Sequence, residues 1–417
     1  MKAKEIIAII ILCIIFFIPL FLRPVAYPVN GMDSYYFLNY IWGITNQIPE
    51  TPPISYLVMS VLPPNILFIK LLMLLITIFS ILIFCKAGEH IKPGYSILIA
   101  LILLSNLFFN KLLIRFEDDI FGLPFIALSI YFMVKYLYKT NKQDKKQLYL
   151  SLFFWGVSCL FWKFSVYLIF LYLFWTNFNI ETTLISIFTG TIFYKQLWNG
   201  LVGNLLIVEN SPIVGILVLF IPMLFFLYSK KTNPKYDTIK YALWFSLLLL
   251  ILNVKFVLLI YPFLAIHYVL TIEKQPETIK IINNIVLIVI FLIATMQNFT
   301  APPNNQYIDL IHVAQSEQKL NPNKEINVSW DFGYLYSWET KQYYPIYGHI
   351  QPTIEKGIVI QTNAEPNNCP IIYKNKVGYT KITFTPDYEY FKYPGLKNDN
   401  LENEVEDDHI NDSHTNV

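Results

Sequence analysis

The chain has 417 residues, of which 55% are hydrophobic and 17% aromatic, and its mean hydropathy is +0.46. Long apolar runs need lipid around them, so this composition excludes an ordinary soluble globular protein. The net charge is only +2 and the lysines are scattered among connecting segments, which excludes the basic stripe of a nucleic-acid-binding protein.

Apolar runs that are long enough, or nearly so, to cross a bilayer recur along the first 299 residues. The sequence therefore predicts a polytopic α-helical membrane protein with about 11 transmembrane helices. The first run is interpreted as an uncleaved helix, because it has no small-x-small cleavage signal. The expected spans are 5–22, 64–84, 95–110, 120–138, 147–162, 164–178, 182–198, 212–229, 239–253, 255–271 and 280–299.

The lysines predict the orientation of these helices. Lys2 and Lys4 precede the first span, and every second connection is rich in lysine, beginning with Lys86 and Lys92. By the positive-inside rule the lysine-rich connections are cytoplasmic. We therefore expect a multi-pass cell-membrane protein with its N-terminus in the cytoplasm and its C-terminal part outside.

Three regions are expected. Residues 1–299 form a transmembrane domain with an external first loop at 23–63. Residues 300–395 form a small external α/β domain, because short apolar-aromatic runs there are typical of strands. Residues 396–417 are acidic and polar, which predicts a disordered tail.

Acidic residues of the predicted external loops come from distant parts of the chain. Asp33 lies in "GMDSYYFLNYI", Glu117 and Asp119 lie in "RFEDDIFG", Glu209 lies in "IVENSP", and Asp331 lies in "VSWDFGY". A carboxylate at a membrane boundary is costly unless it is solvated, paired or bound to a metal. Hard oxygen ligands that converge there would suit Mg²⁺ or Mn²⁺.

Each feature also has a simpler interpretation. Asp33 could be the N-cap of an aromatic-rich helix, and residues 117–119 could be a solvated helix start that the helix dipole favours. Glu209 could be merely exposed in a short loop, and Lys255 could snorkel to the membrane surface. "VSWDFGY" could be a strand and turn with a packed Trp330 and a glycine in the turn.

In their order, these motifs resemble those of the catalytic subunit of oligosaccharyltransferase, in its archaeal or bacterial single-subunit form. That family consists of GT-C membrane glycosyltransferases, and by this resemblance the chain would be a short and divergent member. The family transfers a glycan from a polyprenyl (dolichyl) phosphate or pyrophosphate carrier to the asparagine of Asn-x-Ser/Thr, with inversion at the sugar. The resemblance therefore implies a GT-C fold and an external, metal-dependent active site.

The resemblance also implies roles for individual residues. Asp33 and Glu209 would hold the acceptor amide as catalytic carboxylates. Lys255 would contact the lipid phosphate, and Trp330 and Asp331 would read the acceptor's Ser/Thr hydroxyl. The implied ligands of Mg²⁺ or Mn²⁺ are Asp33, Glu117, Asp119 and Glu209.

Three positions depart from the family pattern. Glu117 stands where Asp is usual, Lys255 stands where Arg is usual, and Ser329 stands in place of a tryptophan. Lysine cannot form the bidentate fork that arginine offers a phosphate. The tail is also small for the family.

The implied partners are a polyprenyl-linked oligosaccharide, an acceptor protein or peptide with Asn-x-Ser/Thr, and membrane lipid, without nucleic acid. Two alternatives stay open. A related GT-C enzyme would move a lipid-linked sugar to a glycolipid or a cell-surface polymer, and the loss of the tryptophan at Ser329 favours that reading. A transporter or scaffold is the third, although transporter folds tend to show internal repeats and none is visible in the sequence.

Overall fold

In the computed structural model the chain divides into two compact units, Met1–Pro302 and Pro303–Val417. Each unit is described by itself. The structure describes residues 1–22, 32–45, 53–106, 109, 113–116, 118–138, 145–176, 178–192, 261–263, 265–266, 269, 277–300, 305–320, 322, 325–328, 330–341, 356–362, 371–374 and 378–384. The expected spans 212–229 and 239–253 and the tail 396–417 lie outside these residues.

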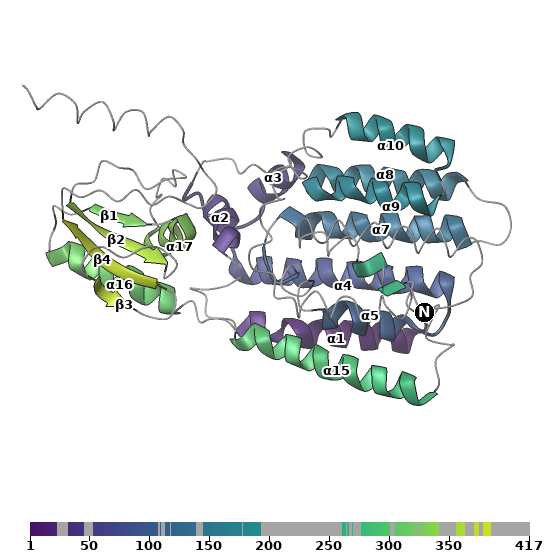
Figure 1. The fold of residues 1–417 in the computed structure, drawn as a ribbon, viewed down its shortest axis with the longest axis horizontal. Coiled ribbons are helices and arrows are strands. Elements are labelled where there is room, and N and C mark those ends of the chain that lie inside the picture. The colour runs from purple at the N-terminus through teal and green to yellow at the C-terminus, as the bar shows by residue number, and fades with distance from the viewer. Residues whose placement is uncertain are drawn as a thin grey trace, which may run out of the picture. The chain divides into compact units, whose positions relative to one another are not determined.

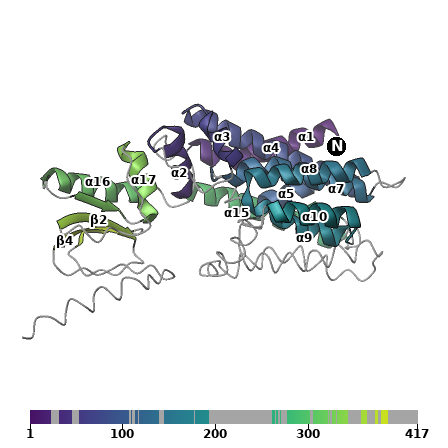
Figure 2. The ribbon, with the colours of Figure 1, turned by 90° about the horizontal axis from the view of Figure 1, so that it is seen from above.

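The first unit is a bundle of helices, drawn in Figures 1 and 2. Within the bundle α7 packs against both α4 and α8, and α5 packs against α4 and α15. The described helices are α1 (Ala3–Leu22), α2 (Met32–Ile41), α3 (Pro53–Ser60), α4 (Ile66–Ile91), α5 (Ser96–Ser105), α7 (Asp118–Tyr138), α8 (Lys145–Phe161), the 3-10 helix η1 (Lys163–Tyr167), α9 (Leu168–Trp175), α10 (Ile180–Ile192) and α15 (Glu277–Thr300).

Three described helices are long and apolar enough to cross a membrane, namely Ala3–Leu22, Ile66–Ile91 and Asp119–Tyr138. The other expected spans that the structure describes are also helical, but α5 and α9 are shorter than predicted. Within the expected span 255–271, residues 261–263 are helical. These findings confirm a multi-pass helical membrane protein, while the full helix count stays a prediction.

Helix α4 is longer than the sequence predicted. It begins after Asn65, whose side-chain Oδ1 accepts a hydrogen bond from the Phe68 N–H at 3.1 Å and caps the first turn. It then continues to Ile91, whereas the predicted span ends at residue 84. Lys86 was assigned to a connecting loop and instead lies on the helix. Its long aliphatic stem allows a lysine to extend a membrane helix past the apolar core.

The bundle has two distinct ends. At one end the Met1 ammonium donates to Glu89 Oε2 at 3.0 Å, which joins the start of α1 to the last turn of α4. His90 Nε2 lies 3.3 Å from Tyr131 Oη, so the C-terminal parts of α4 and α7 meet at this same end. Helices α2 and α3 lie at the opposite end, away from the N-terminus (Figure 1).

Small polar residues hold α7 against α8. The Ser129 hydroxyl donates to the Ser151 carbonyl at 2.8 Å, and the Ser151 hydroxyl donates back to the Ser129 carbonyl at 2.8 Å. The Tyr172 hydroxyl from α9 also bonds to Ser129 Oγ. Small residues let helix backbones approach closely inside a membrane, where no hydrophobic effect drives helices together. This interface fixes the direction of α7, whose first turn carries Asp119.

The second unit contains a four-stranded sheet in the order β1-β2-β4-β3. Its strands are β1 (Glu325–Val328), β2 (Lys356–Thr362), β3 (Ile371–Lys374) and β4 (Gly378–Phe384). β1 pairs with β2 in parallel, while β4 pairs antiparallel with both β2 and β3. Helix α16 (Asn305–Leu320) contacts all four strands, and its buried Leu310, Ile311 and Ala314 form the apolar face.

Helix α17 (Trp330–Thr340) follows β1 directly. The simpler interpretation of "VSWDFGY" as a strand and turn is therefore wrong, because Gly333 lies inside a helix. Buried Leu335, Ser337 and Trp338 lie on this helix. His312 Nε2 lies 3.3 Å from Glu339 Oε1, which links α17 to α16.

Candidate functional site

One hydrogen bond brings the first two acidic motifs together. The backbone N–H of Phe116 donates to Ser34 Oγ at 3.0 Å, and both residues are fully buried. Asp33 precedes Ser34 in the chain, and Glu117 follows Phe116. The "GMDSYY" and "RFEDD" motifs, which are 82 residues apart in sequence at this contact, therefore meet at the end of the bundle that carries α2 and α3.

Asp33 lies in the first turn of α2, which begins at Met32, rather than in front of the helix as an N-cap would. The start of α2 is held in place because the rest of this helix packs into the bundle. Tyr35, Leu38 and Asn39 are buried, so this helix is packed into the bundle. The side chain of Asp33 and all of Glu117 lie outside what the structure describes.

Asp119 is 1% exposed and lies in the first turn of α7. The interpretation of this stretch as a solvated helix start is therefore wrong for Asp119. A helix N-terminus carries a partial positive charge that stabilises a nearby carboxylate. The Phe116 and Phe121 rings meet edge to face at 5.9 Å and pin the motif onto the same helix. Asp119 is thus a buried carboxylate on a rigid element.

The first loop is tied to the bundle a second time. The Ser55 hydroxyl of α3 donates to the Phe161 carbonyl at the end of α8, at 2.5 Å. Phe161 in turn stacks on Phe125 of α7 with 4.9 Å between the ring centroids. Both helices of the first loop are therefore held against the elements that carry the second acidic motif.

A close approach of α7 to the turn after α8 borders Asp119. A Cβ built on Gly122 would lie 2.8 Å from Trp162 Cβ, so only glycine fits there without a shift. Trp162 is buried, and its carbonyl accepts a hydrogen bond from the Ser165 N–H at 3.0 Å. Trp155 Nε1 donates to the Ser165 carbonyl at 2.9 Å and closes the turn. This fixed turn lies in the stretch "LFWKFSVYLIF" at residues 160–170.

Two cations at this end were missed by the sequence reasoning. Lys70 lies in the second turn of α4 and is only 4% exposed. An ionisable residue inside an apolar run is a functional suspect, and its place in the predicted span 64–84 was the available signal. Arg115 is half-buried beside Phe116, and it is one of the two arginines in the chain. Arginine is rare in this chain, so the position of this one next to an acidic motif was the available signal.

The position of the remaining predicted site residues relative to this cluster stays a prediction. Glu209, Lys255 and Ser329 lie outside the described residues. Trp330 is the first residue of α17 and Asp331 lies in its first turn, but both belong to the second unit and their side chains are not described. Among the described residues no group of three or more His, Cys, Asp or Glu side chains is close enough to hold a metal ion. The expected metal site needs Glu117 and Glu209, so it stays a prediction.

Residues 54–194 match the family model described as dolichyl-phosphate-mannose-protein mannosyltransferase. The fold is similar to the crystal structure of ArnT from Cupriavidus metallidurans bound to undecaprenyl phosphate, with a TM-score of 0.54, 9% identity, and coverage of 93% of this chain and 100% of that chain. No curated protein matches the chain. The matched region contains the second acidic motif, Gly122 and the Trp162 turn. The chain therefore has the fold of the GT-C membrane glycosyltransferases.

Proposed function

We propose that this chain transfers a sugar from a polyprenyl-phosphate carrier to an acceptor at the outer membrane surface. The observation that carries the proposal is the Ser34–Phe116 hydrogen bond, which joins two acidic motifs next to the buried carboxylate of Asp119. Support for a lipid-phosphate donor comes from the solved structure with undecaprenyl phosphate and from the family model, whose description names a dolichyl-phosphate sugar.

The chemistry needs a base and a stabilised leaving group. The acceptor atom attacks the anomeric carbon, the bond from that carbon to the phosphate oxygen breaks, and polyprenyl phosphate departs with the bonding electrons. The acceptor's proton passes to a carboxylate, for which Asp119 is the described candidate and Asp33 the candidate from the resemblance. Lys70 and Arg115 are the described cations at this end that would offset the phosphate charge. Lys255 remains the candidate from the resemblance.

A divalent metal fits the donor types. Carboxylate oxygens are the ligands that Mg²⁺ and Mn²⁺ prefer, and Asp119 is held, with little exposure, beside the meeting point of the two motifs. Such an ion would be held by Asp33, Glu117, Asp119 and Glu209. It would draw charge off the departing phosphate.

The acceptor we propose first is a hydroxyl group on a protein, a glycolipid or a cell-surface polymer. A hydroxyl needs a single base to accept its proton, whereas an amide nitrogen is a poor nucleophile and needs two carboxylates to hold it. The family model, whose description names a protein acceptor for mannose, also favours this choice. The asparagine of Asn-x-Ser/Thr is the second candidate. It rests on the "WDFG" motif, which opens α17 with Trp330 and Asp331.

An acceptor panel separates these possibilities. Purified protein in liposomes is supplied with a tritium-labelled polyprenyl-phosphate sugar and with an Asn-x-Thr peptide, a Ser/Thr-rich peptide or a glycolipid, with and without EDTA. We expect label on a hydroxyl acceptor, released by β-elimination where that acceptor is a peptide. Label on the Asn-x-Thr peptide that only an amidase releases would replace the first acceptor by the second. Full activity in EDTA would rule out a required metal ion. If no acceptor receives the sugar, the interpretation as a scaffold or transporter would replace that of an enzyme.

A further inference from the structure

A group of cationic and aromatic side chains lies at the end of the bundle opposite the candidate site. Lys86 Nζ lies 5.7 Å from the centroid of the Tyr131 ring, and Lys135 Nζ lies 5.8 Å from the same centroid. The His90 ring packs on Tyr131 at 5.3 Å, and its Nε2 is 3.3 Å from the tyrosine hydroxyl. We call Lys86, His90, Tyr131 and Lys135 the tyrosine cluster.

The tyrosine cluster is built from two membrane-spanning helices. Lys86 and His90 are one turn apart on α4, and Tyr131 and Lys135 are one turn apart on α7. The two helices pack along each other, and both are long and apolar enough to cross the bilayer. Tyr131 is buried at 9% exposure, Lys135 is half-buried, and Lys86 and His90 are exposed. The two lysines and the histidine therefore surround the buried Tyr131 ring near the membrane boundary.

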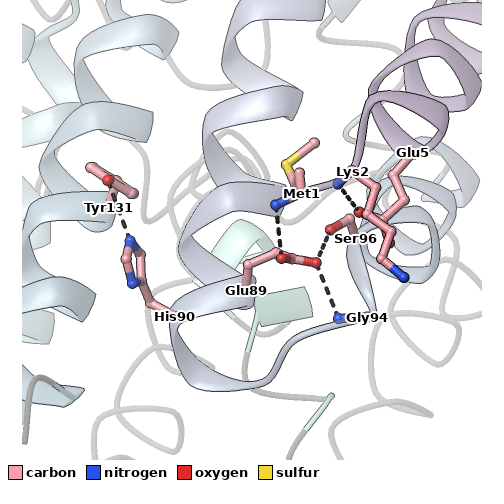
Figure 3. Close-up of polar contacts among 8 residues, drawn as sticks. All are labelled: Met1, Lys2, Glu5, Glu89, His90, Gly94, Ser96 and Tyr131. Carbon is pink, nitrogen blue, oxygen red and sulfur yellow. Dashed lines mark hydrogen bonds and ion pairs between the residues drawn. The ribbon is translucent and has the colours of Figure 1, made fainter.

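The carboxylate of Glu89, next to His90 in sequence, is directed away from the cluster. Glu89 accepts hydrogen bonds from the Met1 ammonium, the Gly94 N–H and the Ser96 hydroxyl, at 3.0, 3.1 and 2.6 Å. Figure 3 shows Glu89 turned toward those groups while His90 reaches the other way, toward Tyr131. A second carboxylate at this end, Glu181 of α10, is bound by Lys145. The cluster therefore carries two lysine charges, and a third when His90 is protonated, and within the described part of the chain none of these groups forms an ion pair with an acid.

We propose that the tyrosine cluster binds the phosphate of an anionic phospholipid headgroup. Basic pockets between membrane helices recognise such headgroups, because the lipid brings its charge to the depth at which the lysines stand. Two ammonium groups and one imidazole supply charge-assisted hydrogen bonds to phosphate oxygens. The Tyr131 ring holds both lysines close together by cation–π attraction, so a bound headgroup finds them already placed. This site is separate from the proposed sugar transfer.

The helix dipole alone also predicts lysines at this end of the bundle. Cations are stabilised at helix C-termini, and Lys86 and Lys135 lie near the ends of α4 and α7. That explanation predicts no preference for one lipid over another beyond the general charge of this end of the bundle. The test therefore compares the removal of the cluster lysines with the removal of two lysines that are already paired with acids.

The experiment measures the association of spin-labelled phosphatidylglycerol and phosphatidylcholine with the full chain in liposomes. Wild-type protein should prefer phosphatidylglycerol, and the double variant Lys86→Gln/Lys135→Gln should lose about fivefold of that preference per lysine. The matched control is Lys145→Gln/Lys280→Gln. Lys145 pairs with Glu181 at 2.5 Å and Lys280 pairs with Glu277 at 3.0 Å, so the same net charge is lost from outside the cluster.

Three outcomes would overturn the proposal. An equal loss in the control would mean that general surface charge decides the preference. An unchanged preference in Lys86→Gln/Lys135→Gln would show that the cluster binds no headgroup. Displacement of phosphatidylglycerol by added inorganic phosphate would mean that the site binds a free anion and does not select a lipid headgroup. If the double variant does not fold, Lys86→Gln alone serves, because that side chain is exposed.

Discussion

At the scale of single residues, the proposed sugar transfer depends most on the carboxylate of Asp119. A carboxylate that is 1% exposed is held at a cost in free energy, and such a cost is usual at functional sites. Asp119→Asn keeps the shape of the side chain and removes its charge and its capacity to accept a proton. We predict a loss of roughly 10²–10⁴-fold in the rate of sugar transfer, the range found for acid–base groups.

The control for this loss is Asp309→Asn, because Asp309 is exposed on α16. Its transfer rate should match that of the wild type, and both variants should elute as the wild-type protein does in size-exclusion chromatography. An Asp119→Asn protein that is folded and transfers sugar at the wild-type rate would remove Asp119 from the mechanism.

At the scale of elements the first prediction concerns the docking of α2. Ser34→Ala removes the acceptor of the buried Phe116 N–H, and leaving a buried donor unsatisfied costs about 1–3 kcal/mol. We predict a lower thermal midpoint and a lower kcat, because the two acidic motifs lose their link. Ser60→Ala is the control, since Ser60 is exposed and only its own helix accepts its hydrogen bond. Equal effects of the two changes would show that the Ser34 contact does not organise the site.

A second element-scale prediction concerns the approach of α7 to the Trp162 turn. Gly122→Ala places a Cβ 2.8 Å from Trp162 Cβ, so the helix or the turn must move. Overpacking of this kind costs about 1–3 kcal/mol, and it should lower both the thermal midpoint and the transfer rate. Gly156→Ala in α8 is the matched change, because nothing lies within 4 Å of the added Cβ. It should leave the midpoint unchanged or raise it slightly. The same midpoint for both variants would contradict the close packing.

Much of this architecture could be predicted from local patterns in the sequence, and the rest could not. The spans of α1, α7 and α15 were predicted to within a few residues because each is a long apolar run bounded by polar residues. The extension of α4 through Lys86 was missed because hydropathy falls before the helix ends. The motifs of Asp33 and Glu117 were recognised from their order. That Ser34 joins them, and that Asp119 is buried, depends on tertiary packing, which a single sequence does not encode locally.

At the scale of the whole molecule the two ends of the bundle should face opposite sides of the membrane. The described cysteines, Cys13, Cys85 and Cys159, are buried. With Cys369 replaced by serine, a membrane-impermeant maleimide should therefore report on introduced cysteines. On intact cells we predict labelling of Ser60→Cys at the α3 end and none of Pro93→Cys at the lysine-rich end; both positions are exposed. Labelling of both from outside would contradict the orientation that the lysines predict.

The proposed transfer of a sugar from a lipid phosphate releases that lipid phosphate, so the measurement of product release is the sharpest test of the activity. Purified protein in liposomes receives a polyprenyl-phosphate sugar labelled in both the lipid and the sugar, together with a hydroxyl acceptor. We predict that free polyprenyl phosphate appears in step with sugar on the acceptor, in equal amounts, and that Asp119→Asn abolishes both. Intact donor after prolonged incubation with folded wild-type protein and every acceptor in the panel would contradict the account.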